Sequence, residues 1–202
     1  RFHLIGIGGA GMSVVAELLA SRGATVEGSD REDSAVLEHL RSVGVRVYVG
    51  HDASHVDPAA VVVVSTAIRE NNPELAIARE RGQRVIHRSQ ALALAASGMR
   101  FVGVAGAHGK TSTSGMLAIA LAACGLDPSV AVGGVLPQLG TGAHLGAGDV
   151  FVAEADESDG SFLNYSPSIE IVTNVEPDHL DRYHSREEFE QIFVEFARRM
   201  VP

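Results

Sequence analysis

The chain of 202 residues has few lysine, cysteine and aromatic side chains, and each shortage excludes certain kinds of fold or function. Tryptophan is absent and aromatic residues make up 5% of the chain, so the core must be built mainly from aliphatic side chains. Cys124 is the single cysteine, which excludes a disulfide framework and is typical of a reducing compartment, so we expect a cytoplasmic protein. Because Cys124 lies in an apolar helical pattern, we expect its side chain to be buried.

Basic blocks and long apolar runs are also missing. Sixteen basic residues against 25 acidic ones give a formal net charge of −9, so nucleic acid is not an expected partner. No apolar run approaches the roughly 20 residues that span a membrane, and glycines and Glu17 interrupt residues 4–20, so we expect neither membrane insertion nor a signal peptide. Because the chain starts at Arg1 inside a strand pattern and stops at Pro202 after a helix pattern, we expect a fragment of a longer protein.

Strand and helix patterns alternate along the chain, which is typical of a parallel sheet with right-handed crossovers. The first series ends near Ser97 and a second begins at Phe101. The spacing predicts strands at 2–6, 25–28, 45–49, 60–64, 84–87, 129–133, 150–153 and 169–173, with a glycine-rich stretch at 133–148. It predicts helices at 10–22, 34–43, 73–81, 90–97, 110–123 and 187–200. The expected fold is α/β, with a Rossmann-like parallel-sheet domain at 1–98 and an incomplete P-loop-type α/β domain at 99–202.

The single lysine lies in a pattern that binds phosphate. Lys110 stands in the segment GAHGKT at 106–111, after an apolar strand and before a helix. Backbone N–H groups of such a turn face an anion, the compact ammonium fits between phosphate oxygens, and the hydroxyl of Thr111 can bind Mg²⁺. The usual P-loop has a glycine where Val104 stands, so an ordinary glycine turn with a chance lysine is the alternative.

A second glycine motif opens the chain. The segment GIGGAG at 6–11 follows a strand and starts a helix, and Asp30 lies at the end of the next strand. This spacing matches the dinucleotide fingerprint with its ribose-binding acid, so NAD is one candidate ligand. Because the geometry requires only a diphosphate at a helix N-terminus, a UDP-sugar is another, and a turn without any ligand is a third.

Acidic and histidine side chains follow two further strands. The segment EADESD at 154–159 places Glu154 at a strand end, where a carboxylate can bind Mg²⁺ or belong to a solvated loop. His179 follows the strand near 169–173 and can bind a metal ion or cap a helix. Because ligands of α/β proteins bind at the carboxyl ends of the strands, we expect the side chains of Lys110, Glu154 and His179 to converge.

Five ordered segments together resemble motifs of the Mur ligases of peptidoglycan synthesis, most closely the member that adds L-alanine. The segments are GIGGAGMS at 6–13, VSTAI at 64–68 with NPE at 72–74, AGAHGKTST at 105–113, EADESDGSF at 154–162 and DHLD at 178–181. The family uses the shorter glycine–lysine loop, so Val104 is no longer a misfit, although the family usually has threonine where Ala107 stands.

The resemblance implies ATP- and Mg²⁺-dependent ligation of L-alanine to the lactyl carboxylate of UDP-N-acetylmuramate through an acyl phosphate. It implies that Lys110 holds the β- and γ-phosphates, that Thr111 and Glu154 hold one Mg²⁺, and that His179 holds a second, with Lys110, Glu154 and His179 as the catalytic residues. The remaining ATP-site residues would be Gly106, His108, Gly109, Ser112 and Asn174. The UDP-sugar would contact Gly8, Gly9, Ala10, Gly11, Met12, Asp30, His51, Ser65 and Thr66.

Three other functions stay open from the sequence. A sister ligase that recycles murein peptides would share the ATP loop, and a NAD-dependent oxidoreductase would explain the first loop but leave Lys110 unused. The third is a UDP-sugar-binding module without catalysis. Because the family has three domains and this chain holds the first and part of the second, we expect the chain alone to bind UDP-N-acetylmuramate without turnover.

Overall fold

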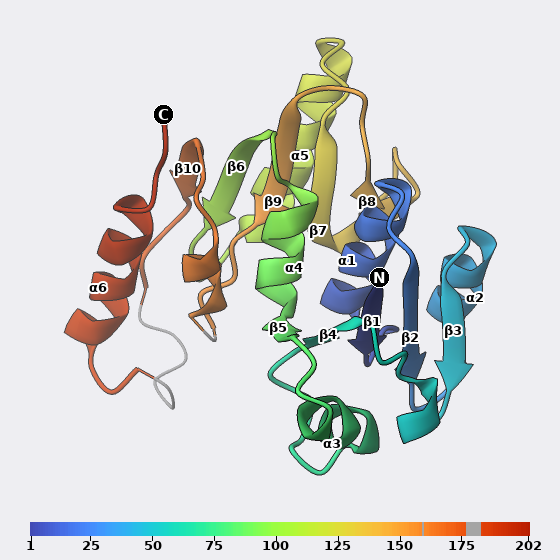
Figure 1. Cartoon of the computed structure of the whole chain (residues 1–202). Helices are drawn as coiled ribbons and strands as arrows, with labels where there is room; N and C mark the ends of the chain where they lie inside the picture. Colours follow the sequence, from blue (N-terminus) through green and yellow to red (C-terminus); the bar gives the residue numbers. More distant parts are fainter. Residues whose placement is uncertain (159, 177–182) are drawn as a thin grey trace. The chain divides into compact units, whose positions relative to one another are not determined.

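The computed structural model describes residues 1–158, 160–176 and 183–202, and the chain divides into two units, Arg1–Ala95 and Ala96–Pro202 (Figure 1). Each unit contains a five-stranded sheet with helices packed against it. The expected α/β class is confirmed. None of the helices in the described part of the chain is long and apolar enough to span a membrane.

The first unit alternates strands and helices throughout. Its strands are β1 (Phe2–Ile5), β2 (Val26–Asp30), β3 (Arg46–Val49), β4 (Val61–Val64) and β5 (Val85–His87). Its helices are α1 (Ala10–Ser21), α2 (Ala35–Ser42), the 3-10 turn η1 (Ala53–His55), α3 (Pro73–Glu80) and α4 (Arg88–Ala95). All strands are parallel in the order β3-β2-β1-β4-β5, which is the Rossmann-like order with its switch point between β1 and β4.

Both faces of the first sheet are covered. Val62 and Val63 are consecutive residues of β4, so their side chains point to opposite faces, and both are fully buried. One face packs against α3, through a cluster that joins Ile5 and Val62 to Leu75. Helix α1 packs against α4 and α2. The run at 60–64 is therefore a strand buried on both faces, as its continuous apolar sequence predicts.

The second unit begins with a strand and the lysine loop. Its strands are β6 (Arg100–Ala105), β7 (Ser129–Leu136), β8 (Thr141–His144), β9 (Val150–Glu154) and β10 (Ile169–Val172). Its helices are α5 (Lys110–Ala123), the 3-10 turn η2 (Ser161–Asn164) and α6 (Arg186–Ala197). The strand order is β10-β6-β9-β7-β8, and all neighbours are parallel except β7 and β8.

The glycine-rich stretch at 133–148 differs from the expectation. It contains the end of β7 and the whole of β8, which pair as an antiparallel hairpin. A Cβ on Gly142 would lie 2.5 Å from the carbonyl oxygen of Val132, so glycine is required there by the close approach of the two strands. The sheet of the second unit is therefore mixed, with β8 as an antiparallel strand at its edge.

Cys124 is also a correction, because its side chain is exposed. Helix α5 ends at Ala123, and the chain turns at Gly125 with φ of 77°. The helix therefore stops one residue before the cysteine, and Ala122 and Ala123 before it are exposed as well.

Three phenylalanines of α6 pack on the sheet face opposite α5. Phe189, Phe193 and Phe196 are buried, as their spacing predicts. Phe196 packs against Phe162 with ring centroids 4.6 Å apart, and a Cβ on Gly103 of β6 would lie 3.2 Å from its ring. The neighbouring Val102 lies in a cluster with leucines of α5. Because successive strand residues face opposite sides, α5 and α6 cover the two faces of β6.

Replacing Phe196 with alanine should destabilise the second unit. Phe196→Ala leaves a cavity between η2 and the sheet and should lower the free energy of unfolding by about 3–5 kcal/mol. Val194→Ala changes a residue of the same helix that is 45% exposed and should cost about 0.5 kcal/mol. Hydrogen exchange of peptides from residues 96–202 measures the difference. Equal protection in the two variants would contradict this packing.

Candidate functional site

The first glycine loop is fixed by the end of strand β2. The N–H groups of Gly6 and Ile7 both donate to the carbonyl oxygen of Ser29, at 2.8 and 2.9 Å. The N–H of Gly8 donates to Oδ2 of Asp30 at 2.8 Å. Asp30, a predicted ribose ligand, is thus in contact with the loop backbone.

A hollow of about 570 Å³ lies over this loop. Helix α1 begins there, with Gly9 as its N-cap, no side-chain cap and no acidic residue in the first turn. Its first N–H groups are therefore suited to an anion. The hollow is lined by Gly6, Gly8, Gly9, Gly11, Met12, Asp30, Glu32, Asp33, Ser34, Ser65, Ala67, Ile68 and Arg88.

The other predicted UDP-sugar residues are spread around this hollow. Ala10 is the first residue of α1. His51 lines a neighbouring hollow of about 270 Å³ that shares Ala67 and Ile68 with the first. Thr66 is exposed and, among the described residues, lines neither hollow. The structure therefore groups Gly8, Gly9, Gly11, Met12, Asp30 and Ser65, and separates His51 and Thr66 from them.

Arg88 is a residue of this hollow that the sequence patterns do not reveal. A Cβ on Gly11 would lie 2.1 Å from Nη1 of Arg88, so the guanidinium covers the glycine. Arg88 is the first residue of α4, far from the glycine motif in sequence. The hollow thus combines one guanidinium and a helix N-terminus, which suit a diphosphate, with carboxylates that can accept hydrogen bonds from ribose hydroxyls.

The lysine loop is tied to the end of β10. Gly106 has φ of 128°, and a Cβ there would lie 2.2 Å from Oγ1 of Thr173, so only glycine fits. Thr173 Oγ1 donates to the carbonyl oxygen of His108 at 2.6 Å. Asn174 donates from Nδ2 to that same oxygen at 2.8 Å and accepts from the His108 N–H at 3.2 Å. Asn174, a predicted ATP ligand, therefore holds the loop backbone.

Four oxygen atoms surround the ammonium group of Lys110. Its Nζ donates to the carbonyl oxygen of Gly106 at 2.7 Å and lies 3.5 Å from that of Ala107. The carboxylate of Glu157 accepts from the same Nζ at 2.9 and 3.1 Å. Glu157 belongs to the acidic segment noted in the sequence, but its position beside the lysine was not predicted.

The described residues at this loop fit a nucleotide bound with Mg²⁺. A hollow of about 320 Å³ is lined by residues 107–112, and α5 starts at Gly109 without a side-chain cap. Glu154 ends β9 and its Oε1 accepts from the N–H of Gly133 at 3.0 Å. A Cβ on the next residue, Gly134, would lie 3.2 Å from Cγ2 of Thr111, so β7 runs past both predicted Mg²⁺ ligands.

His179 lies outside the described residues, so its predicted place beside Lys110 stays a prediction. Within residues 1–158, 160–176 and 183–202, no three His, Cys, Asp or Glu side chains could together hold a metal ion.

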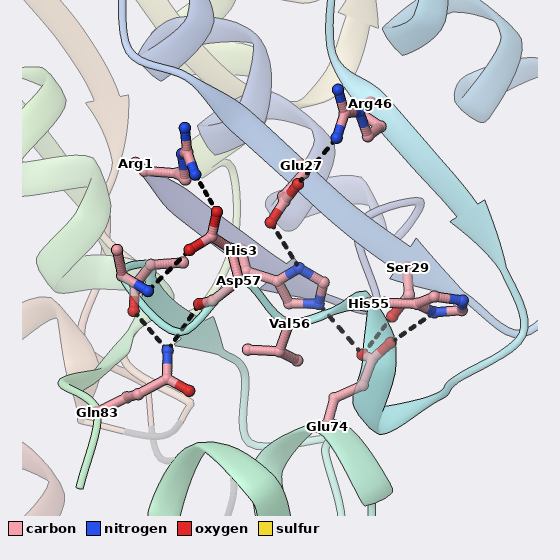
Figure 2. Close-up of polar contacts among 12 residues, drawn as sticks. Arg1, His3, Glu27, Ser29, Arg46, His55, Val56, Asp57, Glu74 and Gln83 are labelled. Atoms are coloured by element: carbon pink, nitrogen blue, oxygen red, sulfur yellow. Dashed lines mark hydrogen bonds and ion pairs between the residues drawn. The ribbon is translucent and has the colours of Figure 1, made fainter. Parts of the chain in front are cut away.

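A buried polar network lies on the first unit's sheet, around the carboxylate of Glu74 (Figure 2). Ser29 Oγ donates to Oε2 of Glu74 at 2.5 Å, and Nδ1 of His51 lies 2.8 Å from the same hydroxyl. His3 is fully buried, with Nε2 3.4 Å from Glu74 and Nδ1 3.7 Å from Glu27. The network therefore fixes Ser29, whose carbonyl oxygen holds the glycine loop.

The second oxygen of Glu74 is also occupied. Nδ1 of His55 and the N–H of Asp52 both lie 3.3 Å from Oε1. Burial by itself raises the pKa of the Glu74 carboxyl, but contacts with His3, Ser29 and the Asp52 N–H together hold that pKa below the ordinary value of 4.5. Glu74 is therefore an anion in the folded chain at neutral pH.

Family models match nearly the whole chain. Residues 1–100 match the model "Mur ligase family, catalytic domain", and residues 104–202 match "Mur ligase middle domain". Among curated proteins, UDP-N-acetylmuramate–L-alanine ligase of Renibacterium salmoninarum is 56% identical over 196 residues, which are 97% of this chain and 42% of that protein. The same ligase of a Nocardioides strain is 52% identical over 202 residues, 100% of this chain and 45% of that protein. The chain thus spans less than half the length of these relatives.

Solved structures agree in fold. UDP-N-acetylmuramate-alanine ligase of Thermotoga maritima matches with a TM-score of 0.88 and 32% identity, over 99% of this chain and 47% of that one. A ligase of Neisseria meningitides that acts on UDP-N-acetylmuramate and L-alanyl-gamma-D-glutamyl-meso-diaminopimelate matches with a TM-score of 0.90 and 30% identity, over 99% of this chain and 68% of that one. The backbone therefore does not separate the two kinds of ligase.

Replacing Glu74 should weaken the first unit in a pH-dependent way. Glu74→Gln removes the anion from its hydrogen bonds and should cost about 1–3 kcal/mol at neutral pH. Because the folded pKa lies below the unfolded one, this stabilisation is present above about pH 4.5 and is lost as the pH falls through the folded pKa.

Denaturant unfolding of residues 1–95 followed between pH 3 and 7 measures the effect. Glu70→Gln is the control. Glu70 precedes α3 and forms an exposed ion pair with Arg79 of that helix, so its replacement should lower the free energy of unfolding by less than about 1 kcal/mol. A Glu74→Gln deficit that stays constant down to pH 3 would contradict the assigned ionisation.

Proposed function

This chain belongs to the Mur ligase family, and from that premise we propose that it is the substrate- and nucleotide-binding part of an ATP-dependent amide ligase. Residues 1–98 would form a domain that binds UDP-N-acetylmuramate, and residues 99–202 the beginning of a domain that binds ATP. The full protein would join L-alanine to the lactyl carboxylate of UDP-N-acetylmuramate. Because the family relatives are more than twice as long, this chain alone would bind without turnover.

The observation that carries this proposal is the environment of Lys110. A single ammonium, enclosed by loop carbonyls and a buried carboxylate, stands at the start of an uncapped helix beside a strand end. This arrangement neutralises phosphate oxygens without a wide guanidinium. An oxidoreductase would leave it without a role, so we set the NAD-dependent function aside.

Two bond-forming steps would complete the reaction. A carboxylate oxygen of the UDP-sugar attacks the γ-phosphorus, the bond to the β–γ bridging oxygen breaks, and ADP leaves. The amine of L-alanine then attacks the acyl carbon, the carbon–oxygen bond to phosphate breaks, and the amine loses a proton. In the first step Lys110 balances negative charge on the β- and γ-phosphates, while backbone N–H groups of residues 107–112, other than that of His108, orient them.

Mg²⁺ would be held by the hydroxyl of Thr111 and the carboxylate of Glu154, and His179 would bind a second ion. When bound, such ions neutralise phosphate charge and draw two polyanions together. The residues of this chain then hold the phosphate-binding loop in place. Asn174 and Thr173 bind its backbone, and Gly106 lets the loop pass close to the end of β10.

In the first unit, Arg88 and the N-terminus of α1 would bind the diphosphate of the UDP-sugar. Gly8, Gly9 and Gly11 would allow close approach of the backbone, and Asp30 would face the ribose. Ser65 lines the same hollow, whereas His51 would reach the ligand from the neighbouring one.

L-alanine is favoured over a murein peptide as the second substrate. Two curated L-alanine ligases are 56% and 52% identical to this chain, whereas a peptide ligase of known structure is 30% identical. An exposed single thiol fits a reducing compartment, and we place the reaction in the cytoplasm.

A thermal-shift titration tests the first-unit assignment. UDP-N-acetylmuramate at about 100 times its Kd should stabilise the chain by roughly 2.7 kcal/mol, and NAD⁺ at the same concentration should not. Arg88→Ala should weaken binding by about 1.5–3 kcal/mol, because it removes a charged hydrogen-bond donor. Arg84→Ala removes the same charge from an exposed neighbouring position and should leave affinity unchanged. Stabilisation by NAD⁺ alone would overturn the proposal.

A further inference from the structure

Glu157 is a buried carboxylate without a role in the mechanism above. Its side chain is fully buried, whereas that of Lys110 is 15% exposed. Both carboxylate oxygens accept from the lysine ammonium, at 2.9 and 3.1 Å. A buried charge is costly unless a partner compensates it, so each of these two groups depends on the other.

The backbone of Glu157 is held from two further places. Its carbonyl oxygen accepts from the hydroxyl of Tyr183 at 2.5 Å and from the N–H of Gly160 at 3.0 Å. The ring of Tyr183 packs edge-on against Phe189 of α6, with centroids 5.4 Å apart. Glu157 is therefore fixed against the packed core of the second unit, and its carboxylate has a defined position.

The hollow at the lysine loop includes Lys110 but not Glu157. It is lined by residues 107–112. An ammonium group has three N–H donors. Gly106 accepts one of them at 2.7 Å, and the two oxygens of Glu157 accept the other two at 2.9 and 3.1 Å, while Ala107 lies at 3.5 Å, the limit of a hydrogen bond. If a phosphate oxygen takes the place of one carboxylate oxygen, the ammonium keeps its bonds to Gly106 and to the other oxygen of Glu157.

We propose that Glu157 is a positioning residue that holds Lys110 toward the nucleotide and stays bonded to it when the nucleotide binds. Lys110 lines the hollow and Glu157 does not, so a phosphate in the hollow can contact the ammonium without occupying the place of the buried carboxylate. The proposal rests on the proposed function, because it assumes that ATP binds at this loop. It assigns a role to the third acid of the segment EADESD, which neither the sequence motif nor the reaction scheme uses.

The single lysine makes a direct test possible. In a chain labelled with ¹⁵N-lysine and ¹³C-glutamate, Lys110 is the source of one side-chain ammonium signal. Scalar coupling across the hydrogen bond from Nζ to a glutamate carboxyl carbon should be present in the ligand-free chain. It should persist, with a shifted ammonium signal, when ATP or a non-hydrolysable ATP analogue is added with Mg²⁺. Loss of the coupling on nucleotide binding would overturn the proposal.

Variants give a second readout. Glu157→Gln should abolish the coupling to a glutamate carboxyl carbon and lower ATP affinity about tenfold, because the ammonium loses the anionic acceptor that holds it in place. Glu157→Asp keeps the charge but shortens the reach, and its affinity should lie between those of Glu157→Gln and wild type. Asp149→Asn removes the same charge from an exposed position of the same unit and should bind ATP as wild type does.

The outcomes separate this proposal from the proposed function. Unchanged or tighter ATP binding by Glu157→Gln would show that Glu157 does not position the lysine. If Glu157→Gln fails to fold, the coupling in the wild-type chain decides the question without it. Absence of ATP binding by the wild-type chain would overturn the proposed function and the role of Glu157 with it, whereas loss of coupling in a chain that binds ATP overturns the role of Glu157 alone.

Discussion

One ammonium group enclosed by four oxygen atoms organises the second unit. Lys110 connects the carbonyl oxygens of its own loop to the carboxylate of Glu157, and Glu157 is in turn held by Tyr183 beside helix α6. The contact therefore joins the phosphate loop, the segment after β9 and the aromatic core of α6. Neither charge can be removed alone without leaving the other buried and unpaired, so a group that would bind ligand is also part of the structure's stability.

Both units combine a helix N-terminus with a cationic side chain, but the cation comes from a different part of the fold in each. In each, a helix begins at a glycine after a parallel strand, without a capping side chain, so its N-terminus suits an anion. In the first unit the cation comes from Arg88 on a distant helix, and the loop is positioned by Ser29 and the network around Glu74. In the second unit the cation lies within the loop itself. A broad guanidinium over an open hollow and a compact ammonium inside a closed loop would suit the diphosphate of a sugar nucleotide and the terminal phosphates of ATP.

Periodicity in the sequence predicts most strands and helices, because both sheets are mainly parallel and their strands are short apolar runs separated by amphipathic helices. It fails at 133–148, where glycines that indicate a loop in isolation are required by the close pairing of β7 with β8. The motifs also predict the two loops, since their glycines are close in sequence. The motifs could not predict which distant side chains form hydrogen bonds with the loops or with the strands beside them. Lys110 and Glu157 are 47 residues apart in sequence, and Ser29 and Glu74 are 45 residues apart. Such contacts depend on tertiary packing that a local pattern does not contain.

The proposed function requires two separate polyphosphate sites in this chain, one in each unit. Calorimetric titration of the wild-type chain and of Lys110→Arg, with UDP-N-acetylmuramate and with ATP and Mg²⁺ in separate experiments, tests it most directly. The wild-type chain should bind one equivalent of each ligand without competition. Lys110→Arg should lose ATP binding and keep the UDP-sugar, because a guanidinium does not fit among the loop oxygens. Competition between the two ligands for one site, or equal loss of both in Lys110→Arg, would contradict it.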